Sequence, residues 1–414
     1  MRILHLIHQF LPDVVGGSEV YTFELAQEQR KRHEVMVFTA WRNSSLADYT
    51  LAPDVVDGIH VTRLVNNYQN IASFKEGYDN PKINAAFEKF LRNFKPDIVH
   101  IHHLSNLSFG IVRLLRDQKI PMVMTLHDFW MVCPRGQRLR PTMERCDEID
   151  LKRCAQCIQP WLGGWQYPVE KHEDHVRERY DSALEILNLI DLLIAPSLFI
   201  KKEFVSLGIS PSKIPFMDYG RDTKRFCNFA KKNDGKKRFG YIGTLIPSKG
   251  VHVLLEAWKN FEDQGATLDI YGADLPYDGW EGYGQVIKEL AEQDPRVSLR
   301  GGYVQKELPR ILSEIDVLIV PSLWLENAPL TIQEALQTGT FVLASRLGGI
   351  PERIIPYQNG LLFDPDNIQD LVDCFQQFLT RSEITQASLA PVHSIEEHVQ
   401  QLEAWYQKVM TQLV

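Results

Sequence analysis

The sequence predicts an α/β protein of two domains, each built around a parallel sheet. The chain has 414 residues, about twice the usual domain size, and 44% of them are hydrophobic, enough for two proper cores. Short apolar runs alternate with amphipathic stretches, which is typical of βαβ units. After Tyr219-Gly220 this alternation starts afresh. We therefore expect two Rossmann-like domains that face a central cleft.

The individual elements follow from the same pattern. In the first half, strands are expected at residues 1–7, 34–40, 97–101, 122–126 and 191–195, with helices at 18–32 and 84–94. In the second half, strands are expected at 238–242, 267–271, 297–300, 316–320 and 341–344, with helices at 251–261 and 286–293. A final amphipathic segment, 395–413, could pack on either domain.

These elements divide the chain into four regions. We place an N-terminal domain at 1–195, with a cysteine-rich loop at 130–165, and a linker at 196–220. A C-terminal domain at 221–390 and a terminal helix at 391–414 follow.

Composition excludes some functions. A net charge of -8 argues against nucleic-acid binding, because phosphate backbones are held by clustered Lys and Arg. No apolar run reaches the roughly 18 residues that a membrane span needs. We expect a cytoplasmic protein.

The most informative stretch lies between Glu326 and Glu334. It follows the expected strand at 316–320 and leads into a helix that stops at Thr338-Gly339. Pro329 favours the first turn of that helix, so Glu326 should lie on the loop and Glu334 on the helix. The free N–H groups at the helix start face the carboxyl edge of the sheet, where open α/β folds bind their ligands. Carboxylates beside them indicate a polyhydroxylated ligand, a sugar or a ribose.

Two glycine-containing loops also precede helices. Gly16-Gly17 follows the first strand, where glycine lets the backbone approach an anion at a helix start, although the bare pair is not the GxGxxG fingerprint and an ordinary turn explains it better. Gly243-Thr244 opens the corresponding loop of the second half, which ends in Lys249-Gly250. A lysine in the first turn of a helix is unfavourable unless an anion lies beside it, so Lys249 is a candidate for binding a phosphate. The alternative interpretation is an ordinary surface lysine at a helix start.

Histidines gather in the first half. His127-Asp128 follows the expected strand at 122–126, where a histidine can hydrogen-bond a substrate hydroxyl or be satisfied by loop backbone. His100, His102 and His103 lie on or near a buried strand, and we interpret them as structural.

Four cysteines crowd one loop: Cys133, Cys146, Cys154 and Cys157. In a cytoplasmic protein disulfides are disfavoured, which leaves a structural zinc site or four free thiols.

Together, these motifs, with Gly302-Tyr303 and residues 348–352 (Gly-Gly-Ile-Pro-Glu), resemble glycosyltransferase family 4, the retaining enzymes of the GT-B fold. The resemblance spans nearly the whole chain, and the second half is the more specific part. It implies that the C-terminal domain holds a nucleotide-sugar donor, that the N-terminal domain holds the acceptor, and that the last helix crosses back to the N-terminal domain.

The resemblance also implies residue roles. Glu334 would bind the ribose, Glu326 and the backbone from Asn327 to Thr331 the donor sugar, and Lys249 and the Gly17 amide the diphosphate. The donor-binding set is then Gly17, Gly243, Thr244, Lys249, Tyr303, Val304, Glu326, Asn327, Ala328, Pro329, Leu330, Thr331 and Glu334. The acceptor side is Gly16, His127 and Asp128, and the catalytic residues are His127, Lys249 and Glu326.

One departure from the family pattern stands beside the diphosphate. The family often has an arginine where this chain has Thr244, so either Lys249 bears more of the charge, or Arg221 or Arg346 assists.

The reaction implied is the metal-independent transfer of a hexose, with glucose from UDP-glucose as the first choice and GDP-mannose and UDP-GlcNAc open. The acceptor would be a saccharide or a lipid-linked one in polysaccharide biosynthesis, with possible peripheral membrane contact. A non-catalytic nucleotide-sugar binder or scaffold is the alternative.

Overall fold

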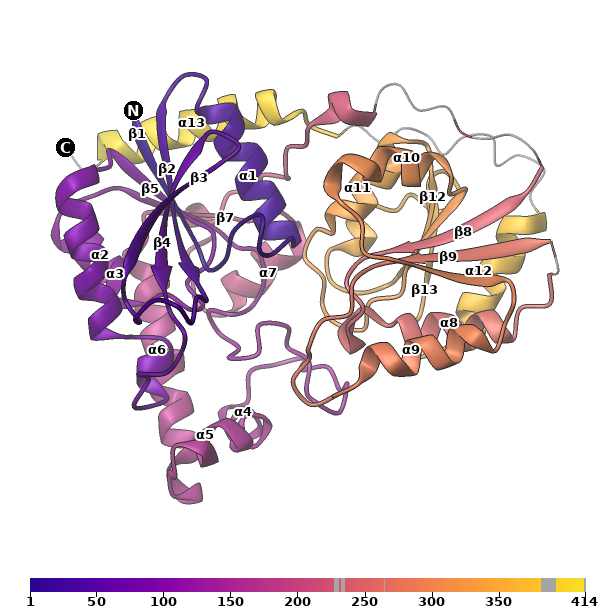
Figure 1. Ribbon diagram of the computed structural model, residues 1–414, viewed down its shortest axis with the longest axis horizontal. Helices are drawn as coiled ribbons and strands as arrows, with labels where there is room; N and C mark the ends of the chain where they lie inside the picture. Colours follow the sequence, from indigo (N-terminus) through magenta and orange to yellow (C-terminus); the bar gives the residue numbers. More distant parts are fainter. Residues whose placement is uncertain (227–230, 232–234, 264, 381–391, 413–414) are drawn as a thin grey trace. The chain divides into compact units, whose positions relative to one another are not determined.

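The computed structural model describes residues 1–226, 231, 235–263, 265–380 and 392–412, which form two compact units (Figure 1). The first comprises Met1–Gly136, Glu148–Arg221 and His393–Val414, and the second comprises Gln137–Asp147 and Asp222–Val392. Each is built on one sheet that is parallel or nearly so. The expected α/β class with two such domains is confirmed.

The sheet of the first unit has seven strands in the order β3-β4-β2-β1-β5-β6-β7. Only the pairing of β3 with β4 is antiparallel. The strands are β1 (Arg2–Ile7), β2 (Glu34–Trp41), β3 (Leu51–Val56), β4 (Ile59–Val65), β5 (Ile98–Ile101), β6 (Met122–Thr125) and β7 (Leu192–Ile194).

Burial explains which strands the sequence reveals. Every residue of β5 and β6 is buried, as expected for central parallel strands covered on both faces, and both were predicted. The β3–β4 hairpin was not predicted. Its turn is Asp57-Gly58, with φ of 46° and 81°, the left-handed pair that a two-residue hairpin requires.

Helices accompany this sheet. They are α1 (Gly17–Gln29), α2 (Pro81–Phe94), α3 (Gly110–Asp117), α4 (Leu151–Cys157), α5 (Gln159–Gly164), α6 (His172–Leu189), α7 (Leu198–Ser206) and α13 (Ile395–Gln412). Asn80 caps α2, because its side chain accepts from the N–H groups of Lys82 and Ile83. The last helix, α13 (yellow in Figure 1), packs against α1, so the expected return of the C-terminal helix to the N-terminal unit is confirmed.

The second unit has six strands in the order β10-β9-β8-β11-β12-β13, all parallel. The strands are β8 (Lys237–Ile242), β9 (Ala266–Tyr271), β10 (Val297–Gly301), β11 (Val317–Val320), β12 (Phe341–Ser345) and β13 (Gly360–Phe363). The helices are α8 (Val251–Lys259), α9 (Tyr283–Glu292), α10 (Leu308–Ser313), α11 (Leu330–Gln337) and α12 (Ile368–Thr380).

Two hydrophobic clusters form the core of the second unit. One joins the sheet to α8, α9 and α12 through residues such as Trp258, Ile287 and Phe375. The other joins it to α10 and α11 through residues such as Ile311 and Ile332. Because helices pack on both faces, β11 is buried throughout and its carboxyl end is the natural place for a ligand site.

Two segments lie in a different unit from the one expected. Residues 196–220, expected as a linker, belong to the first unit, where the Met217 N–H donates to the Ala195 carbonyl at 2.9 Å and extends the pairing beyond β7. Residues 137–147, expected in the N-terminal domain, belong to the second unit. The Tyr277 hydroxyl donates to Gln137 at 2.9 Å, and Arg145 forms an ion pair with Asp366.

Within the part of the chain that the structure describes, no helix has both the length and the apolar character needed to cross a membrane.

Candidate active site

Glu326 is the centre of the polar site in the second unit. It lies on the loop between β11 and α11, as predicted, and is 5% exposed. Its Oε1 accepts three hydrogen bonds: from Lys249 Nζ at 2.6 Å, Ser322 Oγ at 2.7 Å and Trp324 Nε1 at 2.8 Å. The other oxygen, Oε2, takes part in none of these bonds. The carboxylate is therefore held in one orientation through Oε1.

Lys249 lies just before the helix in which it was predicted, and not within it. The expected position was the first turn of α8, but Lys249 ends a separate 3₁₀ turn, Pro247–Lys249, and Gly250 separates it from the helix. Its ammonium group pairs with Glu326 and lies 5.3 Å from the centroid of the Trp324 ring. The anion beside this lysine is thus a carboxylate of the protein, and the lysine side chain is 27% exposed.

Two glycines allow the loops of this site to approach closely. A Cβ on Gly250, at φ 71°, would lie 1.9 Å from the Pro321 carbonyl oxygen, and one on Gly348, at φ 58°, would lie 2.0 Å from the Glu326 carbonyl oxygen. That same carbonyl accepts the Gly349 N–H at 2.7 Å. The loop after β12 therefore fixes the backbone of Glu326.

The helix that carries Glu334 begins one residue later than predicted. Pro329 is the N-cap residue of α11 rather than part of its first turn, and Leu330 is the first helical residue. Glu334 lies on α11 and is 2% exposed, while Asn327 and Ala328 are also buried in the loop before it. The Ile332 N–H already donates to the Pro329 carbonyl at 3.2 Å, so the N–H groups of Leu330 and Thr331 are the donors that the helix start directs toward this edge of the sheet.

The other donor-side candidates lie on neighbouring loops. Gly243 and Thr244 follow β8, and the Tyr241 hydroxyl donates to the Thr244 carbonyl at 2.7 Å. Tyr303 packs against the core, whereas Val304 is 53% exposed. These residues follow β8 and β10, at the same edge of the sheet as Glu326.

The two arginines considered as helpers differ. Arg221 is completely buried in the first unit and forms an ion pair with Glu24 at 3.1 Å, so its charge is already used. Arg346 is exposed in the second unit and donates to the Leu362 carbonyl at 3.1 Å. The structure therefore leaves Arg346, and not Arg221, as a surface cation.

In the first unit, Gly16-Gly17 opens α1 as predicted. Gly16 is the N-cap residue, and a Cβ there would lie 2.5 Å from Glu19 Oε2. Glu19 is 3% exposed, and its Oε1 lies 3.4 Å from His8 Nε2. Burial raises the pKa of Glu19. The helix start thus already has a carboxylate beside it.

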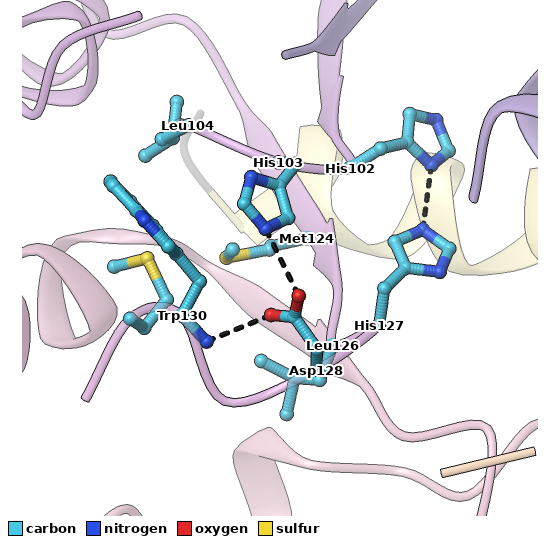
Figure 2. A pocket seen from close by; sticks show the side chains of 9 residues that line it. His102, His103, Leu104, Met124, Leu126, His127, Asp128 and Trp130 are labelled. Carbon is cyan, nitrogen blue, oxygen red and sulfur yellow. Dashed lines mark hydrogen bonds and ion pairs between the residues drawn. The ribbon is translucent and has the colours of Figure 1, made fainter. Parts of the chain in front are cut away.

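His127 and Asp128 follow β6 and line a small pocket (Figure 2). Both nitrogens of His127 have partners: Nε2 lies 3.2 Å from His102 Nδ1, and Nδ1 lies 2.6 Å from the Tyr219 hydroxyl. Burial lowers the pKa of His127 to about 3. His127 is therefore a neutral imidazole that is hydrogen-bonded at both ends.

Asp128 is held in a similar way. Its Oδ2 lies 3.2 Å from His103 Nε2, and its Oδ1 accepts the Trp130 N–H at 2.8 Å (Figure 2). Burial raises the pKa of Asp128, but His103 and the Trp130 N–H outweigh it and leave the pKa below its ordinary value. Asp128 is thus ionised at neutral pH.

Sequence reasoning missed His5 and Gln29. His5 lies on β1 in register with His100 of β5, and its Nδ1 is 3.0 Å from His102 Nε2. His5, His100 and His102 are completely buried, which agrees with the structural interpretation of the last two. The period of two between His100 and His102 places them on one face of a strand, but the adjacency of β1 and β5 comes from the sheet order alone.

The four cysteines carry no disulfide. Cys133, Cys154 and Cys157 lie in the first unit and Cys146 in the second. Among the described residues, the side chains whose possible ligand atoms come together are His5, His100 and His102, within 4.8 Å, rather than these thiols. A zinc site at the cysteines stays a prediction.

Two parallel α/β units with carboxylates, a lysine and helix N-termini at the ends of their strands define a class of ligand-binding α/β proteins. The family model described as Glycosyltransferase Family 4 matches residues 15–225, and the one described as Glycosyl transferases group 1 matches residues 222–390. The chain belongs to glycosyltransferase family 4.

Known proteins resemble this chain along its length. An uncharacterized 42.6 kDa protein in the cps region of Klebsiella pneumoniae is 24% identical over 390 residues, which are 90% of this chain and 91% of that protein. The structure of sucrose-phosphate synthase from Thermosynechococcus elongatus has a TM-score of 0.68 at 17% identity and covers 100% of this chain and 97% of that one. Anabaena Alr3699/HepE, solved in complex with UDP-glucose, has a TM-score of 0.63 at 16% identity and covers 100% and 98%. The fold is GT-B, as expected.

Proposed function

We propose that this protein is a retaining hexosyltransferase that uses a nucleotide diphosphate sugar, with glucose as the first choice of sugar. The observation that carries the proposal is the contact of 2.6 Å between Lys249 and Glu326. Glu326 lies in the loop just before α11, the helix that carries Glu334. Family membership supports the transferase activity. The UDP-glucose complex of Alr3699/HepE, a protein of the same fold, supports the choice of donor.

In this proposal, three side chains contact different parts of the donor. Glu326 accepts a hydrogen bond from a sugar hydroxyl through Oε2, because Oε1 already has three donors. Lys249 stabilises the charge that builds on the departing diphosphate, and Glu334 binds the ribose hydroxyls. The loop backbone from Asn327 to Thr331 completes the donor site.

The proposed transfer reaction needs no metal ion. As the bond from the anomeric carbon to the diphosphate oxygen breaks, the acceptor oxygen bonds to that carbon on the same face and its proton passes to the leaving phosphate. The negative charge develops on the diphosphate, where a lysine and fixed N–H groups are worth most because they are oriented beforehand. The family resemblance assigns the Gly17 amide to this task as well.

Residues of the first unit take the acceptor side of the proposal. Gly16 lets the backbone approach, and His127 hydrogen-bonds a hydroxyl near the reacting sugar. Asp128 is ionised, but both of its oxygens have protein partners, so we assign it to positioning rather than to proton removal. The acceptor in this proposal is a saccharide or a lipid-linked saccharide of polysaccharide biosynthesis, used in the cytoplasm with peripheral membrane contact.

The test begins with a thermal-shift screen of UDP-glucose, UDP-GlcNAc and GDP-mannose. The pure protein should be stabilised most by UDP-glucose and should hydrolyse it slowly. Glu326→Ala should abolish that hydrolysis, while Glu289→Ala, which removes an exposed carboxylate on α9, should leave it unchanged. Tight donor binding with neither hydrolysis nor transfer to any acceptor would instead establish the non-catalytic binder.

A further inference from the structure

A row of hydrogen bonds, buried at its Gln29 end and partly buried at its other end, crosses the first unit to His127 and Tyr219. It runs from Gln29 Oε1 to His5 Nε2 at 2.8 Å, and from His5 Nδ1 to His102 Nε2 at 3.0 Å. It continues from His102 Nδ1 to His127 Nε2 at 3.2 Å, and from His127 Nδ1 to the Tyr219 hydroxyl at 2.6 Å. Both nitrogens of each imidazole are used within the row.

The histidines of this row are neutral. Burial lowers the pKa of His5 to about 4 and that of His127 to about 3, and it holds the pKa of His102 well below its ordinary value. A neutral imidazole has one N–H donor and one bare nitrogen acceptor. Each ring must therefore donate on one side and accept on the other, so the whole row has only two proton arrangements.

Gln29 at the far end distinguishes the two arrangements. Its carbonyl oxygen faces His5 Nε2, and its amide nitrogen donates toward the Tyr406 hydroxyl at 3.4 Å. His5 must then donate through Nε2–H and accept at Nδ1. The same polarity passes to His102 and to His127, whose Nδ1 is left bare and accepts the hydroxyl proton of Tyr219.

A second arm from Gln29 has the matching polarity. The Tyr406 hydroxyl accepts from Gln29 and lies 2.7 Å from His100 Nδ1, to which it donates. His100 Nε2 then donates to Thr125 Oγ1 at 2.8 Å. Turning the Gln29 amide over would reverse both arms together. One side chain of α1 thus sets the proton polarity of every histidine in the row.

We propose that Gln29 is a positioning residue that fixes the tautomer of His127, leaving Nδ1 as a hydrogen-bond acceptor. A substrate hydroxyl that takes the place of the Tyr219 hydroxyl then donates a hydrogen bond to Nδ1. A substrate group that can only accept hydrogen bonds does not bind there. This inference rests on the proposed role of His127 toward a sugar hydroxyl.

A metal ion held by His5, His100 and His102 is the rival explanation of this cluster. A metal needs lone pairs that converge on one point. Here His5 Nδ1 and His102 Nε2 are directed at each other, while both nitrogens of His100 are directed at Tyr406 and Thr125. The geometry favours the hydrogen-bonded row.

The experiment is ¹⁵N NMR of the full chain labelled at histidine, which separates bare from protonated ring nitrogens. The His127 signals are identified by their loss in His127→Gln. Wild-type protein should show bare Nδ1 and protonated Nε2 at His127. In Gln29→Met the ratio of the two tautomers should fall roughly tenfold, the equivalent of one hydrogen bond of about 1.4 kcal/mol. Gln29→Glu, which can only accept, should restore the wild-type tautomer.

Gln27→Met is the matched control, since Gln27 lies on the same helix but donates to the Asp57 carbonyl. It should leave the His127 signals unchanged. A protonated Nδ1 in the wild type, a Gln29→Met spectrum like that of the wild type, or signals that shift with stoichiometric Zn²⁺ would overturn the inference. These readings need no substrate. A wild-type protein that shows the expected tautomer but turns over no nucleotide sugar would therefore refute the proposed function and not the row.

Discussion

The contact between Lys249 and Glu326 yields a quantitative prediction. Lys249→Ala removes a charge-assisted bond of 2.6 Å whose partners are 27% and 6% exposed. Such a bond contributes about 1.5–3 kcal/mol, and the lower end applies because Ser322 and Trp324 still hold the carboxylate. The unfolding free energy should therefore fall by about 1.5 kcal/mol. Turnover should fall more, roughly 10²-fold, because charge is removed where the transition state gains it.

A double-mutant cycle with Glu326→Gln shows whether the two residues act as a unit. Residues in contact couple by about 0.5–3 kcal/mol, so the double variant should lose less activity than the product of the single losses. The assay is nucleotide-sugar hydrolysis at saturating donor, together with urea unfolding. Lys288→Ala is the control, since that exposed lysine lies 3.9 Å from Glu292 on α9. An unchanged rate in Lys249→Ala, or losses that simply multiply, would refute the reasoning.

Three further outcomes are expected. Glu334→Ala should weaken UDP binding with less effect on turnover at saturating donor, and unaltered affinity for UDP by calorimetry would rule out the ribose role. Gly348→Ala should inactivate the enzyme, because the new Cβ would lie 2.0 Å from the Glu326 carbonyl oxygen; a normal hydrolysis rate would show that this loop can yield. Stability should fall below about pH 6.5: burial lowers the pKa of His5 and His398 from 6.5 to about 4, so the unfolded chain is protonated first. Each contributes a loss of about 1.4 kcal/mol per pH unit down to pH 4, measured by urea unfolding, and equal stability at pH 7 and pH 5 would contradict it.

The sequence predicts the interior strands well because burial on both faces produces continuous apolar runs. β2, β8 and β12 each begin within a residue of the expected place. Strands β3 and β4 were missed because no residue of β3 is fully buried and because polar residues interrupt the apolar residues, Asp54 in β3 and His60, Thr62 and Arg63 in β4. Their one clear sign was the Asp57-Gly58 turn, a short-range hairpin signal.

The site could be predicted only in part from the sequence, because it depends on contacts between residues that are far apart in the chain. The motif around Glu326 was recognisable, but its pairing with Lys249, 77 positions away, depends on β8 and β11 being neighbours in the sheet. The same holds for Arg221, whose burial against Glu24 could not be foreseen from composition. Residue type and spacing thus gave candidates, and the strand order decided which of them meet.

Both polar sites hold their key groups before any ligand arrives, but by different physical means. Glu326 is a buried charge, so its orientation is fixed by three donors and must be sensitive to the loss of Lys249. His127 is a neutral imidazole, and in our proposal the order of hydrogen-bond donors and acceptors back to Gln29 distinguishes its two tautomers. A substitution near Glu326 should therefore change the energy of a charged transition state. A substitution at Gln29 should instead change whether His127 binds a substrate group that donates a hydrogen bond or one that accepts it. The two kinds of variant can therefore be distinguished, because the first changes turnover and the second changes substrate choice.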